Sequence, residues 1–341
     1  MRAREQFTDM FWLMKKSHPQ LHKIMDELHA RAKEGDAEAQ FSLAEKYHTF
    51  ADSEFVDQSK ALEFFSKSAM QGHKEALKQL RMYAEKMKEF AAQYYLGIIY
   101  KHGNGVLIDK FEAAKWFISA AELDQHGHTN AWFEAGIVYH LGNGVSKNPK
   151  EATKWFYKAA GRGNEEAFEY LKKYAEQGLV EAQYNVASLY KDDYFRRSKI
   201  THRVRLQDVM DGVNRTVEDD KEVVKWSIKA AEQGHIQAQL DLIDMYRDGI
   251  YVSKNSKEEA KWLFKAASKG NERALSLLHI AADKAVHEAQ YNLGIMYANG
   301  EAVLKDLRKA KDLLGKAHGS NDSKMKEKSK QAYDEYELWK Y

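Results

Sequence analysis

The sequence predicts an all-α protein built from repeated pairs of helices, and three observations lead to this prediction. A tyrosine follows an opening alanine by eight positions in six copies: Ala39/Tyr47, Ala92/Tyr100, Ala131/Tyr139, Ala182/Tyr190, Ala238/Tyr246 and Ala289/Tyr297. A bulky residue follows that tyrosine by sixteen positions in four copies, Tyr100/Trp116, Tyr139/Trp155, Tyr246/Trp262 and Tyr297/Leu313, and by seventeen in the first, Tyr47/Phe64. Only 2 prolines occur in 341 residues, which favours helices over a turn-rich sandwich. A fixed period of this kind is typical of a repeat array.

The stretch 92–121 illustrates one unit, with two apolar segments of helical length around a Gly-Asn-Gly turn. Apolar residues recur at helical spacing in both segments, at Ala92, Leu96, Ile99 and Tyr100 and then at Ala114, Phe117, Ile118 and Ala121. This period indicates that each segment is a helix with one buried face. The unit is therefore predicted to be a helical hairpin.

Shorter units between some hairpins predict single helices. They lie around Ala76, Ala167 and Ala274, and a fourth spans residues 19–35. Because the end units of a solenoid expose an apolar face, capping helices are expected at both termini. The predicted organisation is an N-terminal capping helix with a degenerate helix unit at 1–35, a solenoid at 36–318 with an insertion at about 191–215, and a C-terminal capping helix at 319–341.

Residues at the helix ends support these boundaries. A glycine follows several apolar helices, where a left-handed cap needs no Cβ atom: Gly35, Gly72, Gly178, Gly234 and Gly270. Asp36, Asn164 and Asn271 follow as N-caps, and Asn148 precedes the first-turn proline Pro149. Two capping boxes are expected, at Asp109–Glu112 and at Ser256–Glu259.

Composition excludes several classes of protein. Lys plus Arg number 53 against 51 for Asp plus Glu, so the net charge of +2 gives no strong attraction of the whole chain to nucleic acid. The absence of cysteine excludes disulfides, thiolate metal sites and a cysteine nucleophile. No apolar run approaches the roughly 18 residues of a transmembrane helix, and the first residues lack the core of a secretory signal. A cytoplasmic location is expected, with export or delivery to a host without a cleavable signal as the alternative.

The repeating motif resembles the Sel-1-like repeat (SLR), a relative of the tetratricopeptide repeat. The pattern A-Q-x-x-L-G-x-x-Y, G-x-G-V and A-x-x-W is formed by Ala92, Gln93, Leu96, Gly97, Tyr100, Gly103, Gly105, Val106, Ala113 and Trp116, and it recurs over roughly residues 30–320. Ala135 and Leu313 depart from it as tolerable core substitutions. The resemblance implies a right-handed α/α superhelical solenoid that acts as a protein-binding scaffold. Family members are adaptors in signalling, in protein quality control and in bacterial manipulation of host traffic, so a bacterial effector is one expectation.

One column of the first helices is the predicted partner surface. Two positions after each opening alanine stand Phe41, Tyr94, Phe133, Tyr184, Leu240 and Tyr291. By analogy with tetratricopeptide arrays, this position faces the concave groove, where aromatic rings suit a partner helix or extended peptide. The alternative is that these rings pack only between repeats. The tyrosine and tryptophan of the motif itself are predicted to lie in the core.

Trp226 follows Tyr190 by 36 positions, whereas the regular copies have a spacing of 16. The 20 extra residues are interpreted as an insertion. It carries a basic cluster within 194–210: Arg196, Arg197, Lys199, Arg203 and Arg205. Insertions in repeat proteins map to loops, and long loops are often either functional or disordered. A partner-contacting or mobile loop, a solvated loop without function, and a binder of nucleic acid or anionic lipid all remain open.

No catalytic or metal-binding pattern is complete. The Gly-Asn-Gly turns at 103–105 and 142–144 lack the strand or Lys-Ser/Thr of a phosphate loop, and His126 and His128 provide too few ligands for a metal. Ser188 and Lys191 match S-x-x-K formally, but no S-D-N or K-T-G accompanies them. The sequence therefore predicts a non-enzymatic scaffold without metal or cofactor that binds a protein or peptide. Nucleic-acid or anionic-surface binding through 194–210 is the alternative function.

Overall fold

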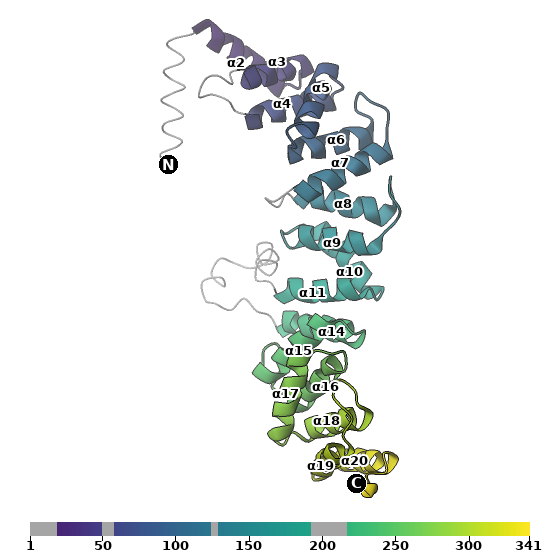
Figure 1. Ribbon diagram of the computed structural model, residues 1–341. Coiled ribbons are helices and arrows are strands. Elements are labelled where there is room, and N and C mark those ends of the chain that lie inside the picture. Colours follow the sequence, from purple (N-terminus) through teal and green to yellow (C-terminus); the bar gives the residue numbers. More distant parts are fainter. Residues whose placement is uncertain (1–18, 50–57, 124–128, 192–216) are drawn as a thin grey trace, which may run out of the picture. The chain divides into compact units, whose positions relative to one another are not determined.

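A computed structural model describes residues 19–49, 58–123, 129–191 and 217–341, and these residues form α-helices joined by short turns (Figure 1). No β-strand occurs in these four ranges. The predicted all-α class, with hairpins and interspersed single helices, is confirmed. The chain forms two compact units, Met1–Ala159 and Ala160–Tyr341, and each is described by itself.

Within its described residues, the first unit contains three hairpins and two single helices. The hairpins pair α3 with α4, α6 with α7, and α8 with α9, while α2 precedes the first hairpin and α5 lies between the first two. The helices are α2 (Pro19–Lys33), α3 (Ala37–Thr49), α4 (Gln58–Met70), α5 (Lys74–Glu85), α6 (Phe90–His102), α7 (Lys110–Leu123), α8 (Thr129–Leu141) and α9 (Pro149–Ala160).

The second unit repeats this plan. Its hairpins pair α11 with α14, α15 with α16, and α18 with α19, and α10 and α17 are single helices. The helices are α10 (Glu165–Glu176), α11 (Val180–Lys191), α14 (Val217–Glu232), α15 (Ile236–Asp248), α16 (Ser256–Ala267), α17 (Glu272–Asp283), α18 (His287–Asn299), α19 (Leu307–His318), α20 (Ser323–Glu335) and the short 3₁₀ helix η2 (Leu338–Lys340). Both α20 and η2 pack on α19, and Leu338 is fully buried there.

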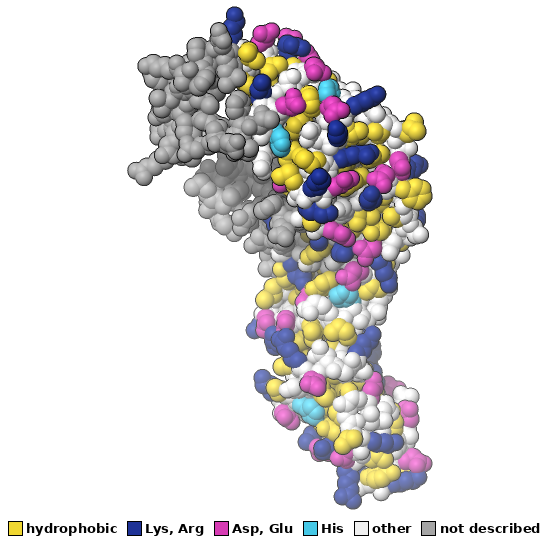
Figure 2. Space-filling model, turned by 45° about the horizontal axis from the view of Figure 1, so that its top comes forward, with side chains coloured by type: hydrophobic (Ala, Val, Ile, Leu, Met, Phe, Trp, Pro, Cys, Tyr) yellow, Lys and Arg dark blue, Asp and Glu magenta, His cyan; other side chains and the backbone are white. Residues whose placement is uncertain are grey.

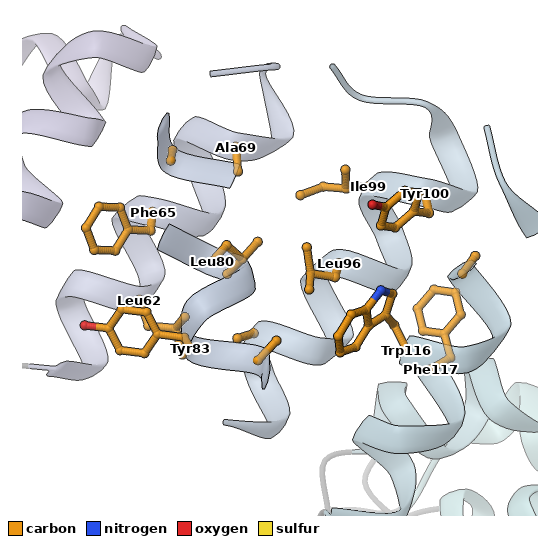
Figure 3. Close-up of a cluster of buried hydrophobic side chains, with 14 of the residues drawn as sticks. Leu62, Phe65, Ala69, Leu80, Tyr83, Leu96, Ile99, Tyr100, Trp116 and Phe117 are labelled. Carbon is orange, nitrogen blue, oxygen red and sulfur yellow. The ribbon is translucent and has the colours of Figure 1, made fainter. Parts of the chain in front are cut away.

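A continuous apolar cluster joins helices α3 to α8 of the first unit. Figure 3 shows side chains from α4, α5, α6 and α7 meeting in one cluster, with Trp116 and Phe117 of α7 beside Leu96 of α6. The glycine of the L-G-x-x-Y motif permits this approach, because a Cβ atom on Gly97 would lie 2.6 Å from the ring of Phe117. Gly136 has the same relation to Phe156, at 2.5 Å. The motif glycine thus sets the distance between the two helices of a hairpin.

A buried glutamine ties the first helix of five hairpins to the helix before it. Its side-chain Nε2 donates to a carbonyl oxygen in the last turn of that preceding helix, which has no partner within the helix itself. The bonds measure 3.0–3.1 Å and run from Gln40 to Ala32, Gln93 to Ala84, Gln183 to Ala175, Gln239 to Ala231 and Gln290 to Ala282. In α8, the indole nitrogen of Trp132 replaces the amide and donates to Ala121 at 3.2 Å. The second residue of the motif is therefore a connector between successive helices.

The predicted cap residues are confirmed, but the two predicted capping boxes are not. The five predicted cap glycines all have φ between 84° and 95°, and Asp36, Asn148, Asn164 and Asn271 accept bonds from the first backbone N–H groups of their helices. Asp109 accepts from Glu112 N, yet its own N–H donates to Tyr100 O rather than to the Glu112 carboxylate. The capping box placed at Ser256 is wrong. Asn255 caps α16 instead, accepting from Lys257 N and Glu258 N at 3.1 Å, because its amide side chain is as good a cap as the serine hydroxyl.

Candidate functional site: the first-helix column

The six residues of the predicted partner surface, called here the first-helix column, share one degree of burial. Phe41, Tyr94, Phe133, Tyr184, Leu240 and Tyr291 are all partly buried, and none is fully exposed or fully enclosed. In contrast, the flanking motif alanines and glutamines are buried. The column residues therefore lie at the edge of the core, where part of each side chain reaches the surface.

In the first unit, each ring of the first-helix column packs against an aromatic ring on the second helix of its own hairpin. The ring centroids are 5.9 Å apart for Phe41 and Phe65, and 5.9 Å for Tyr94 and Phe117. They are 6.0 Å apart for Phe133 and Phe156. Tilted contacts at these separations are favourable for aromatic pairs, so the hairpin core fixes the orientation of the column.

A histidine covers another side of two column rings. The His73 ring stacks on Phe41 with centroids 4.5 Å apart, and the His235 ring stacks on Tyr184 at 4.3 Å. Over the ring of Tyr291 in α18 lies a lysine of α20, with the Nζ atom of Lys328 5.0 Å from the ring centroid. The column thus differs from copy to copy in what lies over its rings.

The two histidines belong to a network that sequence reasoning missed. His73 Nδ1 accepts from Ala76 N as the N-cap of α5, and its Nε2 lies 3.0 Å from Glu38 Oε2. Because Nδ1 is the acceptor, Nε2 carries the proton and donates to the carboxylate. Gln71 Nε2 also donates to Gln40 Oε1 at 2.8 Å.

The second unit repeats this network on α11, α14 and α15. His235 Nδ1 accepts from Ala238 N, its Nε2 lies 3.5 Å from Glu181, and Gln233 donates to Gln183 at 2.8 Å. The signal in the sequence is the tripeptide Gln-Gly-His, at 71–73 and again at 233–235.

Ion pairs link successive first helices on the side of the column. Lys101 of α6 contacts both carboxylate oxygens of Glu134 of α8, at 2.7 and 2.8 Å. Lys191 of α11 pairs with Asp241 of α15 in the corresponding place. Burial, followed by the Glu134 carboxylate and Tyr95, raises the pKa of Tyr94. Its phenol therefore stays neutral and acts at this surface as a ring with a hydroxyl group.

The motif tryptophans lie in the core, as predicted, whereas the same prediction for the motif tyrosines is only partly right. Tyr100 and Tyr190 are buried, but four are only partly buried: Tyr47, Tyr139, Tyr246 and Tyr297. Trp116, Trp155, Trp226 and Trp262 are 6, 2, 1 and 1 % exposed. Each of the last three tryptophans has two lysines over its ring, one at the preceding position and one three positions later. For Trp155, the Nζ atoms of Lys154 and Lys158 lie 5.0 and 4.5 Å from the ring centroid. Such contacts contribute on the order of 0.5–1 kcal/mol at the surface. This second column is a structural element rather than a ligand surface.

The remaining predicted sites are not brought together as functional centres. The basic residues Arg196, Arg197, Lys199, Arg203 and Arg205, like the pair His126 and His128, lie outside the described residues. Within the described ranges, no group of three or more acidic, histidine or cysteine side chains could hold a metal. No described helix is both long and apolar enough to cross a bilayer. Lys191, of the S-x-x-K match, pairs with Asp241.

Comparisons with known proteins identify the repeat. The family model described as Sel1 repeat matches residues 37–73, 90–125, 131–164, 162–179, 211–235, 236–271 and 287–317. No curated protein matches, and nothing in these comparisons supports nucleic-acid binding.

Two solved structures are similar in sequence. The c5321 protective antigen of uropathogenic Escherichia coli strains, which displays an SLR fold, is 24% identical, over 88% of this chain and 80% of that chain, with a TM-score of 0.24. A Sel1 repeat protein from Oxalobacter formigenes is 24% identical, over 75% and 83%, with a TM-score of 0.25. The family model itself matches more than half of the chain, so this protein belongs to the Sel1 repeat family.

Proposed function

We propose that this chain is a non-enzymatic scaffold that binds a partner protein or peptide along the first-helix column. Sel1 repeat proteins typically mediate protein–protein interactions, and the repeat is a non-catalytic scaffold fold. The observation that carries the proposal is the recurrence of a partly exposed large side chain at one register position in six first helices. Aromatic residues in such settings are frequent centres of binding energy at protein interfaces.

The best-suited part of the column is the pair of helices α6 and α8. Tyr94 and Phe133 are both held by rings of their own hairpins, and the Lys101–Glu134 ion pair joins the two helices beside them. The ring of Tyr94 contacts Tyr95 and Phe117, whereas Phe41 and Tyr184 each carry a stacked histidine. A partner would place apolar side chains against the two rings and polar groups near the ion pair, which together provide burial and orientation.

A pair of double variants tests this assignment. Tyr94→Ala with Lys101→Ala removes one tyrosine and one ion-paired lysine from the first helix α6. The matched control, Tyr157→Ala with Lys154→Ala, removes the same two residue types from the second helix α9, where Lys154 pairs with Glu151. Partners are captured on the wild-type protein by affinity purification, and circular dichroism verifies that both variants are folded.

We expect the α6 variant to lose the partners that the wild type captures and the α9 variant to retain them. Equal retention by both folded variants would disprove the placement of the binding surface on the first helices.

A further inference from the structure

Three large apolar side chains project from the turn between α6 and α7. Leu107 is 89% exposed, Ile108 64% and Phe111 75%. These three residues are called here the 107–111 knob. Single exposed apolar residues are ordinary on protein surfaces, but contiguous ones mark sites of interaction. The knob is distinct from the first-helix column and does not depend on the function proposed for it.

The corresponding turns of three other hairpins show that the fold does not need apolar residues here. The places of Leu107, Ile108 and Phe111 are taken by Ser146, Lys147 and Lys150, by Ser253, Lys254 and Lys257, and by Leu304, Lys305 and Arg308. Only Leu304 among these nine is apolar. All four turns lead into a helix capped by Asp or Asn, at Asp109, Asn148, Asn255 and Asp306. The knob is therefore an addition to a turn that forms equally well with polar residues.

The backbone holds the knob in place. Asp109 N donates to Tyr100 O at 3.0 Å, and Asp109 Oδ1 accepts from Phe111 N at 2.9 Å. Gly103 ends α6 with φ of 76°, and a Cβ atom there would lie 2.8 Å from Ile108 Cγ1. The side chains are thus presented to solvent from a defined turn, so little further ordering is needed when they bind.

Basic residues surround the knob. The next turn lies alongside, because Gly144 approaches the backbone of Lys110 so closely that a Cβ atom would be 2.2 Å from its carbonyl oxygen. That turn contributes Leu141, which is 56% exposed, together with the exposed Lys147 and Lys150. Figure 2 shows one face of the protein, on which yellow hydrophobic side chains lie among dark blue Lys and Arg and magenta Asp and Glu side chains.

The positive charge of this surface is not neutralised nearby. Among the described residues, no ion pair involves Lys110, Lys147 or Lys150. Two neighbouring acids are engaged by other lysines, since Glu112 pairs with Lys115 at 3.1 Å and Glu151 pairs with Lys154 at 3.5 Å. The third acid, Asp109, lies within the knob as the cap of α7, so three lysines outnumber one carboxylate. The rim of the knob therefore attracts an anionic surface.

We propose that the 107–111 knob inserts into the interface of an anionic lipid bilayer, with Lys110, Lys147 and Lys150 against the headgroups. Three side chains offer an apolar patch of roughly 300–400 Å², well below the roughly 800 Å² per partner of a stable protein dimer. The knob projects and so provides no groove for a peptide. A bilayer interface accepts projecting apolar side chains, and lysines beside them add attraction to anionic lipids.

A graft from the neighbouring turn separates insertion from simple charge attraction. The variant Leu107→Ser, Ile108→Lys, Phe111→Lys carries the residues of positions 146, 147 and 150, so the turn should fold as its neighbour does. It adds two positive charges. Binding is measured by co-sedimentation with phosphatidylcholine vesicles, with and without phosphatidylserine.

The wild type is expected to bind the vesicles that contain phosphatidylserine, and the graft to bind them at least about tenfold more weakly despite its higher charge. Equal or tighter binding by the graft would show that charge alone is responsible. If the wild type binds neither kind of vesicle, the proposal is overturned. This would hold even if the knob proved to contact an acidic protein instead.

A fluorescent probe tests insertion directly, because the chain has no cysteine of its own. Leu107→Cys and Leu304→Cys place a single nitrobenzoxadiazole label on corresponding turns, at residues that are 89 and 91 % exposed. Leu304 stands beside Lys305 and Arg308 but lacks apolar companions, which makes it the matched control. A blue shift with phosphatidylserine vesicles is expected at 107 and not at 304. Equal shifts, or none at 107, would contradict insertion.

Discussion

The two aromatic columns of this protein use similar residues at the same repeat period for different purposes. The tryptophans of the second helices are enclosed, as Trp155 illustrates with 2% of its surface exposed. Lysine side chains lie over their rings. The first-helix column, in contrast, is only partly buried at all six positions. Because each column recurs once per repeat, periodicity alone cannot distinguish them. What distinguishes them is whether the neighbouring helices cover the ring on every side.

The largest difference between the columns should appear in stability. Trp155→Ala removes an enclosed indole and should lower the free energy of unfolding by about 3–5 kcal/mol. Tyr94→Ala removes a ring that already contacts solvent and should cost only about 1 kcal/mol. Urea unfolding followed by circular dichroism measures both. Similar losses for the two variants would show that the first-helix column is also core.

The second-largest effect on stability should come from the close contact between the two helices of a hairpin, α6 and α7. Gly97→Ala places a Cβ atom 2.6 Å from the Phe117 ring and should destabilise the protein by about 1–3 kcal/mol, because the ring must move. Gly315→Ala is the control, since no atom lies within 4 Å of its Cβ position and alanine favours a helix. Thermal unfolding of both variants gives the comparison, and a neutral Gly97→Ala would refute the steric role of the motif glycine.

The glutamine connector should have a somewhat smaller effect. Gln183→Leu removes the side-chain donor to the Ala175 carbonyl oxygen, which keeps its bond from Gly178 N, and also removes the acceptor of Gln233. The expected cost is about 1–2 kcal/mol. Gln177→Leu, at an exposed position, should change the stability little. Chemical denaturation distinguishes the two, and equal behaviour would argue against a connecting role.

The smallest expected effect on stability concerns Tyr190, a core tyrosine whose ionisation matters only at alkaline pH. Burial, then the carboxylates of Glu222, Asp219 and Glu169, raise the pKa of Tyr190 from 10.0 to about 12. The folded state holds the phenol neutral, so this stabilisation is complete below pH 10 and is lost as the pH rises from about 10 to about 12. The wild type should lose stability relative to Tyr190→Phe over this interval. Parallel pH profiles would contradict the raised pKa.

The sequence was sufficient to predict the hairpins and the single helices, because each apolar period and cap residue acts locally. The role of Gln93 was not predictable in this way. Its partner is the Ala84 carbonyl of the preceding helix, and a contact between helices cannot be read from the period of either one. The same reason applies to the Gln-Gly-His networks, in which His73 and Glu38 are 35 positions apart.

The column residues were identified by their register, but the sequence could not separate them. Phe41 and Tyr184 are stacked with His73 and His235, whereas Tyr94 contacts Tyr95 and Phe117. The 107–111 knob was also missed. Alignment on the motif draws attention to the positions that repeat, and Leu107, Ile108 and Phe111 stand where the copies differ.

Photo-crosslinking tests the central claim, that partners bind the first helices, most directly. Benzoylphenylalanine replaces Tyr94, Phe133 or, as the control on the second helix α9, Tyr157. All three changes retain an aromatic ring, so the fold should be preserved. We expect positions 94 and 133 to crosslink to the same partner and position 157 to give none. Crosslinking from 157 alone, or equally from all three positions, would contradict the assignment of function to the first-helix column.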